Sequence, residues 1–224
     1  MRSDLVFPIY DNCIEQQKIG CQMRKIDRKE FVKGAVAMGV AAGTGILSGK
    51  EGVCAMKKVD LKVLSDQNAF DLIGKNWMLV TAGTQDKFNT MTASWGGLGW
   101  LWNRPVAFVF IRPERYTHEF IEREGRLTLS FYPEECRGIL QFCGTKSGRD
   151  VDKVKETGLR PVALESGAMT FGQAQLTLDC RKLFKSPMTE ANFIDKSILK
   201  KWYGTQPGGS LHDVYVVEIE NVYA

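Results

Sequence analysis

Six consecutive uncharged residues, Val106-Ala107-Phe108-Val109-Phe110-Ile111, constrain the fold more than any other feature of this 224-residue chain. Their β-branched and aromatic side chains predict a strand that is buried on both faces or forms a barrel wall. The remaining pattern predicts further strands at 77–82, 89–95, 127–132, 171–183 and 214–222, and short helices near 65–73, 117–123, 134–142 and 192–202. Because strands and helices do not alternate as in βαβ units, we expect residues 56–224 to form one mostly-β domain, a closed antiparallel β-barrel with short helices.

Composition and missing motifs exclude several function classes. The 30 Lys and Arg residues against 26 Asp and Glu give a net charge of +4 without a basic stripe, which argues against nucleic acid as a partner. His118 and His212 are the only histidines and lie far apart, with no suggestive neighbourhood, so a histidine-based metal site or hydrolase is not expected. The chain also has no complete G-x-G-x-x-G, P-loop or G-x-S-x-G motif. These absences indicate a bound cofactor that carries the chemistry itself, with no catalytic residue and no metal.

Residues 1–55 are predicted to be a leader outside the globular fold. A charged stretch from Met23 to Lys33 precedes the uncharged Ala/Gly-rich run at 34–49, and Val53-Cys54-Ala55 supplies a small-residue cleavage site. Arg28-Lys29 stands where a twin-arginine export signal has two arginines, so export to the periplasm is expected, with a cytoplasmic location as the alternative. The structural alternative is a buried Ala/Gly-rich helix. No uncharged run reaches the roughly 18–20 residues that span a bilayer, so membrane insertion of the mature domain is not expected.

Three clusters in the predicted domain carry hydroxyl, aromatic and cationic groups. Asn89-Thr90-Met91-Thr92-Ala93-Ser94-Trp95 places three hydroxyls in a row on one face of a strand, although a plain solvent-facing strand would look the same. In Arg112-Pro113-Glu114-Arg115-Tyr116-Thr117-His118, two guanidiniums precede a helix that Thr117 is expected to cap, an arrangement suited to phosphate or merely to a solvated surface. The third cluster, Lys146-Ser147-Gly148-Arg149-Asp150-Val151-Asp152-Lys153, is a basic turn before another helix.

In this order and spacing the three clusters, together with Asn103-Arg104-Pro105, resemble the flavin reductase-like family, and particularly its flavoredoxin branch. The resemblance runs from roughly Leu72 to the C-terminus. It implies the FMN-binding split β-barrel fold, a homodimer, and electron transfer from NAD(P)H or a redox protein through FMN to an acceptor. It also implies that the flavin is held by Asn89, Met91, Thr92, Ser94, Trp95, Arg112, Arg115, Thr117, Ser147, Arg149 and Lys153.

Two other functions remain open. The domain is alternatively a non-catalytic module that stores or senses FMN, or a lipid- or peptide-binding barrel whose apolar strand at 106–111 lines a pocket. Export would also separate the protein from cytoplasmic NAD(P)H, so an exported member would need another donor, such as a redox protein at the membrane.

Overall fold

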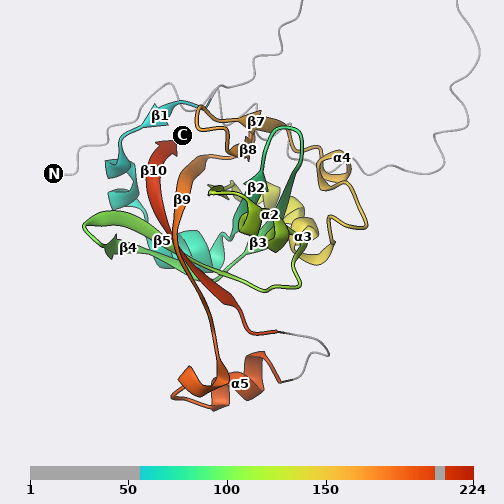
Figure 1. Cartoon of the computed structure of the whole chain (residues 1–224). Coiled ribbons are helices and arrows are strands. Elements are labelled where there is room, and N and C mark those ends of the chain that lie inside the picture. Colours follow the sequence, from blue (N-terminus) through green and yellow to red (C-terminus); the bar gives the residue numbers. More distant parts are fainter. Residues whose placement is uncertain (1–55, 205–209) are drawn as a thin grey trace, which may run out of the picture.

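A computed structural model describes residues 56–204 and 210–224 of the chain (Figure 1). The leader expected at 1–55, with its twin-arginine-like Arg28-Lys29 pair, lies outside the described residues. Within the described part, no helix is both long enough and apolar enough to cross a bilayer.

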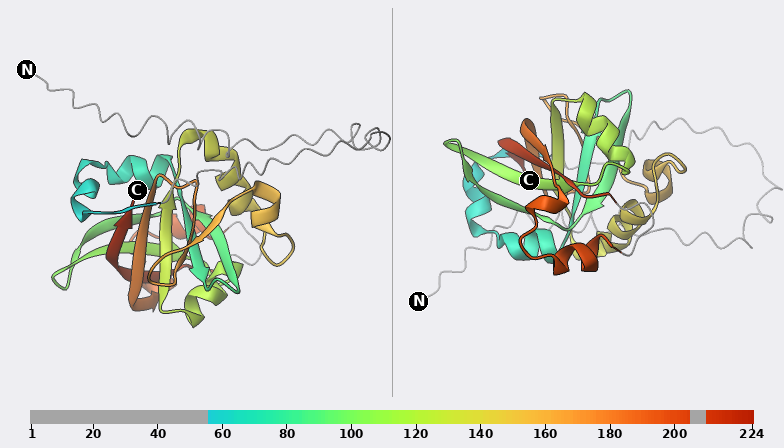
Figure 2. Two further views of the ribbon diagram at one scale, coloured as in Figure 1. Left: turned by 90° about the horizontal axis from the view of Figure 1, so that it is seen from above. Right: turned by 60° about the horizontal axis from the view of Figure 1, so that its bottom comes forward.

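One antiparallel sheet forms most of the domain and curls around a common interior (Figures 1 and 2). Its strands pair in the order β3-β2-β6-β9-β10-β5-β4, and β1 adds to β10 as the eighth strand. The mostly-β prediction is therefore confirmed. The bounds are β1 Lys58–Val59, β2 Met78–Gly83, β3 Phe88–Ala93, β4 Gly96–Leu101, β5 Arg104–Ile111, β6 Arg126–Phe131, β9 Leu176–Pro187 and β10 Asp213–Tyr223, and a separate hairpin pairs β7 Pro161–Ala163 with β8 Met169–Phe171.

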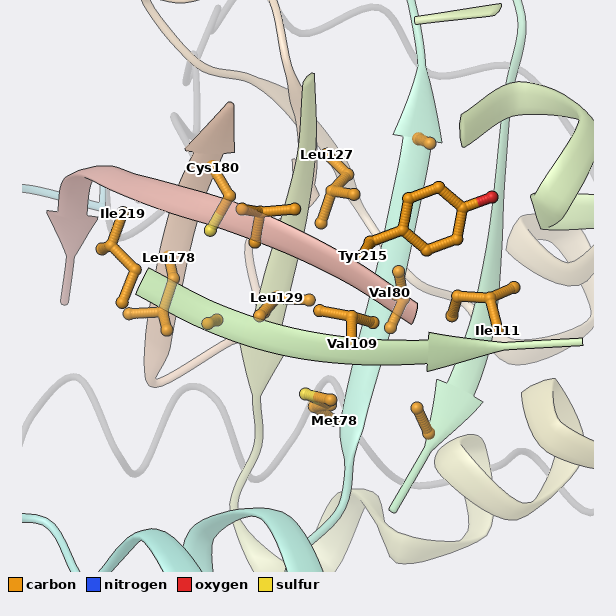
Figure 3. Close-up of a cluster of buried hydrophobic side chains, with 14 of the residues drawn as sticks. Met78, Val80, Val109, Ile111, Leu127, Leu129, Leu178, Cys180, Tyr215 and Ile219 are labelled. Carbon is orange, nitrogen blue, oxygen red and sulfur yellow. The ribbon is translucent and has the colours of Figure 1, made fainter. Parts of the chain in front are cut away.

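The predicted apolar strand is β5, which lies between β10 and β4 in the sheet. Val106, Val109 and Ile111 are fully buried, whereas Arg104 at the start of β5 is exposed. Figure 3 shows Val109 and Ile111 meeting side chains from β2, β6, β9 and β10, and Tyr215 lies among them. This cluster is the main hydrophobic core.

Short helices cover one end of the sheet. Helix α2 packs on β2 and β3, and α3 packs on β3, where Ile139 and Leu140 form a second buried cluster with Leu79 of β2 (Figure 1). The helical bounds are η1 Leu61–Asp66, η2 Phe70–Lys75, α2 Tyr116–Arg123, η3 Glu134–Cys136, α3 Arg137–Thr145, α4 Lys153–Thr157, η4 Glu190–Asn192 and α5 Ser197–Trp202.

The long strands β9 and β10 extend beyond the rest of the sheet and carry α5 at their far end (Figure 1). The predicted helix at 192–202 was too long, because only 197–202 is α-helical. None of its side chains is buried, so tertiary packing does not extend it. The Asp195 carboxylate accepts a hydrogen bond from the Ser197 amide at 2.9 Å and marks the start of the helix.

Three other sequence predictions differ from the structure. The strand expected at 171–183 is two strands, because a turn after β8 directs the Gln175 amide to the Phe131 carbonyl before β9 begins. The helix expected at 65–73 is a 3₁₀ turn followed by a π-helical turn.

Strand β4 was not predicted, because its glycines resemble a nucleotide-binding loop. Glycine is needed at Gly96, where a Cβ would lie 2.8 Å from the Phe108 carbonyl oxygen of the neighbouring strand.

Candidate functional site

A cavity of about 730 Å³ opens where β3, the β5–α2 connection, the loop after α3 and the α5 segment meet. All three sequence clusters contribute to it, although they are far apart in the chain. Ten of the eleven predicted site residues line it: Asn89, Met91, Thr92, Ser94, Trp95, Arg112, Arg115, Thr117, Ser147 and Lys153.

The eleventh residue, Arg149, does not line this cavity. Its guanidinium lies 4.7 Å from the Tyr116 ring centroid, bonds the Glu119 carboxylate and donates to the Glu114 carbonyl at 3.1 Å. It faces a neighbouring hollow of about 610 Å³ on the other side of Tyr116.

Strand β3 supplies one wall of the cavity. The buried Asn89 side chain donates from Nδ2 to Thr117 Oγ1 at 2.8 Å. The row of hydroxyls expected to face a ligand is largely engaged within the protein instead. Thr90 bonds the Thr81 hydroxyl at 2.9 Å, and Thr92 donates to the Leu140 carbonyl. Of the three, Ser94, just beyond the end of β3, lines the cavity without a side-chain hydrogen bond to another described residue.

The β5–α2 connection brings cations to the N-terminus of a helix. Arg115 occupies the N-cap position of α2 with extended backbone angles, so the prediction that Thr117 caps this helix was wrong. Thr117 lies inside the first turn, fully buried, where its hydroxyl accepts from Asn89. Arg115 Nη1 donates to the Gly144 carbonyl at 2.9 Å, which fixes the guanidinium beside the loop after α3.

Arg112 reaches the opposite part of the cavity, toward α5. Its Nη2 donates to the Trp202 carbonyl at 3.1 Å, and its guanidinium lies 5.2 Å from the Tyr203 ring centroid. A guanidinium has five N–H donors, so this contact leaves others for a ligand.

The loop after α3 approaches β3 closely at Gly148. A Cβ on Gly148 would lie 2.0 Å from Asn89 Oδ1 and 3.2 Å from Tyr116 Cδ1, so only glycine fits this contact without displacing Asn89. Lys153, the first residue of α4, is buried, and its Nζ donates to the carbonyls of Thr90 and Cys143 at 2.7 Å each. Burial, reinforced by Arg115, lowers the pKa of the Lys153 ammonium to about 8. One of its three N–H groups remains for a ligand.

Sequence reasoning missed the α5 side of the cavity. Lys201 and Trp202 from α5 and His212 from the start of the returning chain all line it. His212 had been set aside for lack of a suggestive neighbourhood, yet its Nδ1 lies 2.9 Å from the Tyr203 hydroxyl. Burial, together with the nearby Arg112, lowers the pKa of His212 to about 4, so the ring is neutral at physiological pH. The sequence feature that could have indicated this part of the site is the run of basic and aromatic residues at 200–203.

The second histidine has a different environment. His118, on α2, has its Nε2 2.8 Å from Oδ2 of Asp213, the first residue of β10, and both side chains are nearly buried. Lys185 also contacts Asp213, at 3.0 Å. The His118–Asp213 pair is not part of the cavity lining.

The lining suits a ligand that combines a planar ring with an anionic group. Among the described residues, five cationic side chains line the cavity, against the carboxylate of Glu114: Arg112, Arg115, Lys146, Lys153 and Lys201. The cations and the free N–H groups at the start of α2 favour phosphate, and Trp95 and Trp202 offer ring faces. Among the described residues, no cluster of His, Cys, Asp or Glu has the arrangement of a metal site.

A comparison with known protein families gives one match, the flavin reductase like domain, over residues 70–224. The match includes every cavity residue described above. This chain belongs to the flavin reductase-like domain family. No curated protein matches the chain significantly.

Solved structures show the same fold as this flavin reductase-like domain. An FMN-binding domain of a flavin reductase-like enzyme from Shewanella baltica OS155 superposes with a TM-score of 0.54 at 17% identity, covering 76% of this chain and 77% of that one. Flavoredoxin from Methanosarcina acetivorans gives 0.52 at 21% identity, covering 66% and 68%. An FMN-binding protein from Thermus thermophilus, solved with bound 1-cyclohex-2-enone, gives 0.50 at 19% identity, covering 83% and 79%. Family and fold together support a flavin cofactor and a flavin oxidoreductase.

Proposed function

We propose that this domain binds FMN without a covalent link and acts as a flavin reductase or flavoredoxin-like electron carrier. The observation that carries the proposal is the convergence of three separate chain segments on one cationic cavity, with Asn89, Thr117 and Gly148 in direct contact. FMN is favoured over a flavin without phosphate because the cavity holds two cations near the N-terminus of α2, the buried Lys153 and the exposed Arg115.

The residues of the chain have distinct roles in this proposal. Lys153, Arg115 and the first turn of α2 hold the phosphate, and Ser147 adds a hydroxyl from the loop after α3. Met91 and Trp95 cover the ring, and Ser94 supplies a hydrogen-bonding group at its edge. When bound, the flavin supplies the hydride and electron exchange, so the protein needs no side chain as acid or base. The wall formed by buried β3 side chains limits the access of water to the ring.

We further propose that the protein is a homodimer and that its electron donor is NAD(P)H or a redox protein. The leader proposed at 1–55 favours a redox protein, because exported proteins do not meet the cytoplasmic nicotinamide pool. Changing Arg28-Lys29 to two glutamines should then retain the precursor in the cytoplasm, and unchanged export of this variant would contradict the leader.

The function is tested by the absorption spectrum of the purified protein, recorded before and after FMN is added and again after anaerobic NADH. Retained flavin bands with bleaching and turnover support a reductase, whereas flavin that binds without NADH turnover points to a carrier or a storage module. Absence of FMN binding at micromolar concentrations contradicts the proposal and leaves the lipid- or peptide-binding alternative.

A matched pair of variants tests the phosphate assignment. Lys153→Met removes the buried ammonium of the cavity, and Lys155→Met removes an exposed one from the same helix. We expect the first variant to weaken FMN binding by at least about tenfold and leave riboflavin binding unchanged, because charge-assisted hydrogen bonds contribute about 1.5–3 kcal/mol. Lys155→Met should match the wild type. Equal effects of the two variants would show that Lys153 does not hold the phosphate.

A further inference from the structure

Three aromatic rings meet at the α5 side of the cavity, and we call Trp95, Trp202 and His212 the aromatic corner. The centroids of Trp95 and Trp202 lie 5.3 Å apart with the ring planes at 86°, and Trp95 and His212 are also 5.3 Å apart. Trp95 and Trp202 are 40% and 47% exposed. Two indoles thus present open surface in a cavity that is also lined by Met91, Phe110 and several cationic side chains.

Two hydrogen bonds join the aromatic corner to neighbouring residues. The Trp202 carbonyl accepts from Arg112, and His212 Nδ1 lies 2.9 Å from the Tyr203 hydroxyl. Because the pKa of His212 is lowered to about 4, this ring is an uncharged aromatic surface at neutral pH. The Tyr203 contact orients the His212 ring, and the Arg112 bond holds the backbone that carries Trp202, before any ligand arrives, which reduces the entropy lost on binding.

One cation belongs to the aromatic corner. The Lys201 ammonium lies 5.1 Å from the Trp202 ring centroid and lines the cavity. It forms no ion pair with any residue in the described ranges 56–204 and 210–224. The Glu114 carboxylate, the one acidic group that the described part of the chain adds to the lining, already accepts from the Ser210 hydroxyl and lies 3.9 Å from Arg112. Lys201 therefore contacts the half-exposed Trp202 ring and has no carboxylate partner among the described residues.

We propose that the aromatic corner and Lys201 form a subsite for a second ligand, a compact planar aromatic anion such as an aromatic carboxylate or sulfonate. This inference rests on the proposed function and adds the chemical class of the molecule that binds next to the flavin. The phosphate end of the cavity, at Arg115 and Lys153, comes from other chain segments, so it does not account for Lys201.

The short distance between charge and ring favours a compact ligand. An anionic group that contacts Lys201 while its ring stacks on Trp202 must lie on the ring itself or within a bond or two of it. In a nicotinamide dinucleotide a ribose separates the ring from the diphosphate, so that molecule fits the subsite less well.

Isothermal titration with 2-naphthoate and its uncharged isostere 2-naphthamide tests the proposal on purified protein with and without saturating FMN. We expect naphthoate to bind about fivefold more tightly than naphthamide, as for a partly exposed ion pair. Lys201→Gln should remove this preference, whereas Lys200→Gln, which changes the neighbouring lysine outside the cavity lining, should keep it. Trp202→Leu should weaken both ligands by about tenfold through lost stacking.

Each outcome bears on the subsite separately from the flavin. Equal affinity for the two ligands, or equal effects of Lys201→Gln and Lys200→Gln, would overturn the subsite even in protein that binds FMN normally. Tighter binding of NADH than of naphthoate, lost in Trp202→Leu, would identify a dinucleotide site instead. Failure of FMN to bind, with naphthoate binding intact, would contradict the proposed function and leave the subsite standing. Because both lysines and Trp202 are exposed, these variants should retain the fold, which circular dichroism checks.

Discussion

The Asn89 side chain on β3 donates a hydrogen bond of 2.8 Å to the hydroxyl of Thr117 on α2, 28 residues further along the chain. Both groups are buried, so this bond holds together the strand and the helix that line adjacent parts of the cationic cavity. The first predictions concern this contact and the glycine that packs against it.

Thr117→Val keeps the shape of the side chain and removes the acceptor of Asn89. We expect the free energy of unfolding to fall by about 1–3 kcal/mol, because a buried amide donor loses its short hydrogen bond. Urea denaturation measures the change. In a double-mutant cycle with Asn89→Ala the two losses should not add, with a coupling of about 1 kcal/mol. Additive losses would mean that the bond contributes nothing to stability.

Gly148→Ala should damage the site through crowding. The new Cβ would lie 2.0 Å from Asn89 Oδ1, and Asn89 cannot move without breaking its bond to Thr117. We expect a loss of about 1–3 kcal/mol in stability and weaker FMN binding, measured by thermal unfolding and flavin titration. Gly125→Ala is the control, because nothing lies within 4 Å of a Cβ there. Normal FMN affinity in Gly148→Ala would remove this contact from the site.

The affinity for FMN should depend on pH through Lys153. Its pKa of about 8 means that the ammonium is charged below pH 8 and increasingly neutral above it. Binding a phosphate above pH 8 then requires uptake of a proton, so the Kd should rise with pH, at most about tenfold per unit. Fluorescence titrations of FMN and riboflavin measure this, and riboflavin, which has no phosphate, should show no such rise. In Lys153→Met the rise should disappear, and its persistence would assign the titration to another group.

Stability should fall in acid because of His212. Its pKa is about 4 in the folded protein and near the ordinary 6.5 in the unfolded chain, so the unfolded chain binds the proton more readily between these values. The stabilisation is fully present above about pH 6.5 and is lost as the pH falls toward 4, by on the order of 2 kcal/mol. Denaturation of wild type and His212→Asn between pH 7 and 4 measures the difference. Parallel curves for the two proteins would contradict this prediction.

Much of the fold could be predicted from local sequence. The apolar run at 106–111 lies within β5, and the alternating pattern at 214–222 lies within β10. Both could be predicted because successive side chains of a strand point to opposite faces of the sheet, so the local pattern shows which faces are buried. Strand β4 could not be predicted, since Gly96 is selected by the backbone of Phe108 on a neighbouring strand, a contact that the local sequence does not contain.

The site shows the same division between local and long-range information. Ten of the eleven residues proposed from sequence line one cavity, because their segments lie at the ends of strands and helices that meet there. Thr117 was wrongly predicted to cap α2, and its bond to Asn89 could not be predicted because Asn89 is distant in sequence. The contribution of Trp202 and His212 depends on how far β9 and β10 extend past the sheet, and no local pattern encodes that length.

The position of α5 has a consequence for how such a protein can diversify. Helix α5 buries none of its side chains, so replacements there leave the barrel interior intact. Substitutions in α5 can therefore change which small molecules reach the proposed flavin site without destabilising the barrel that would hold the flavin.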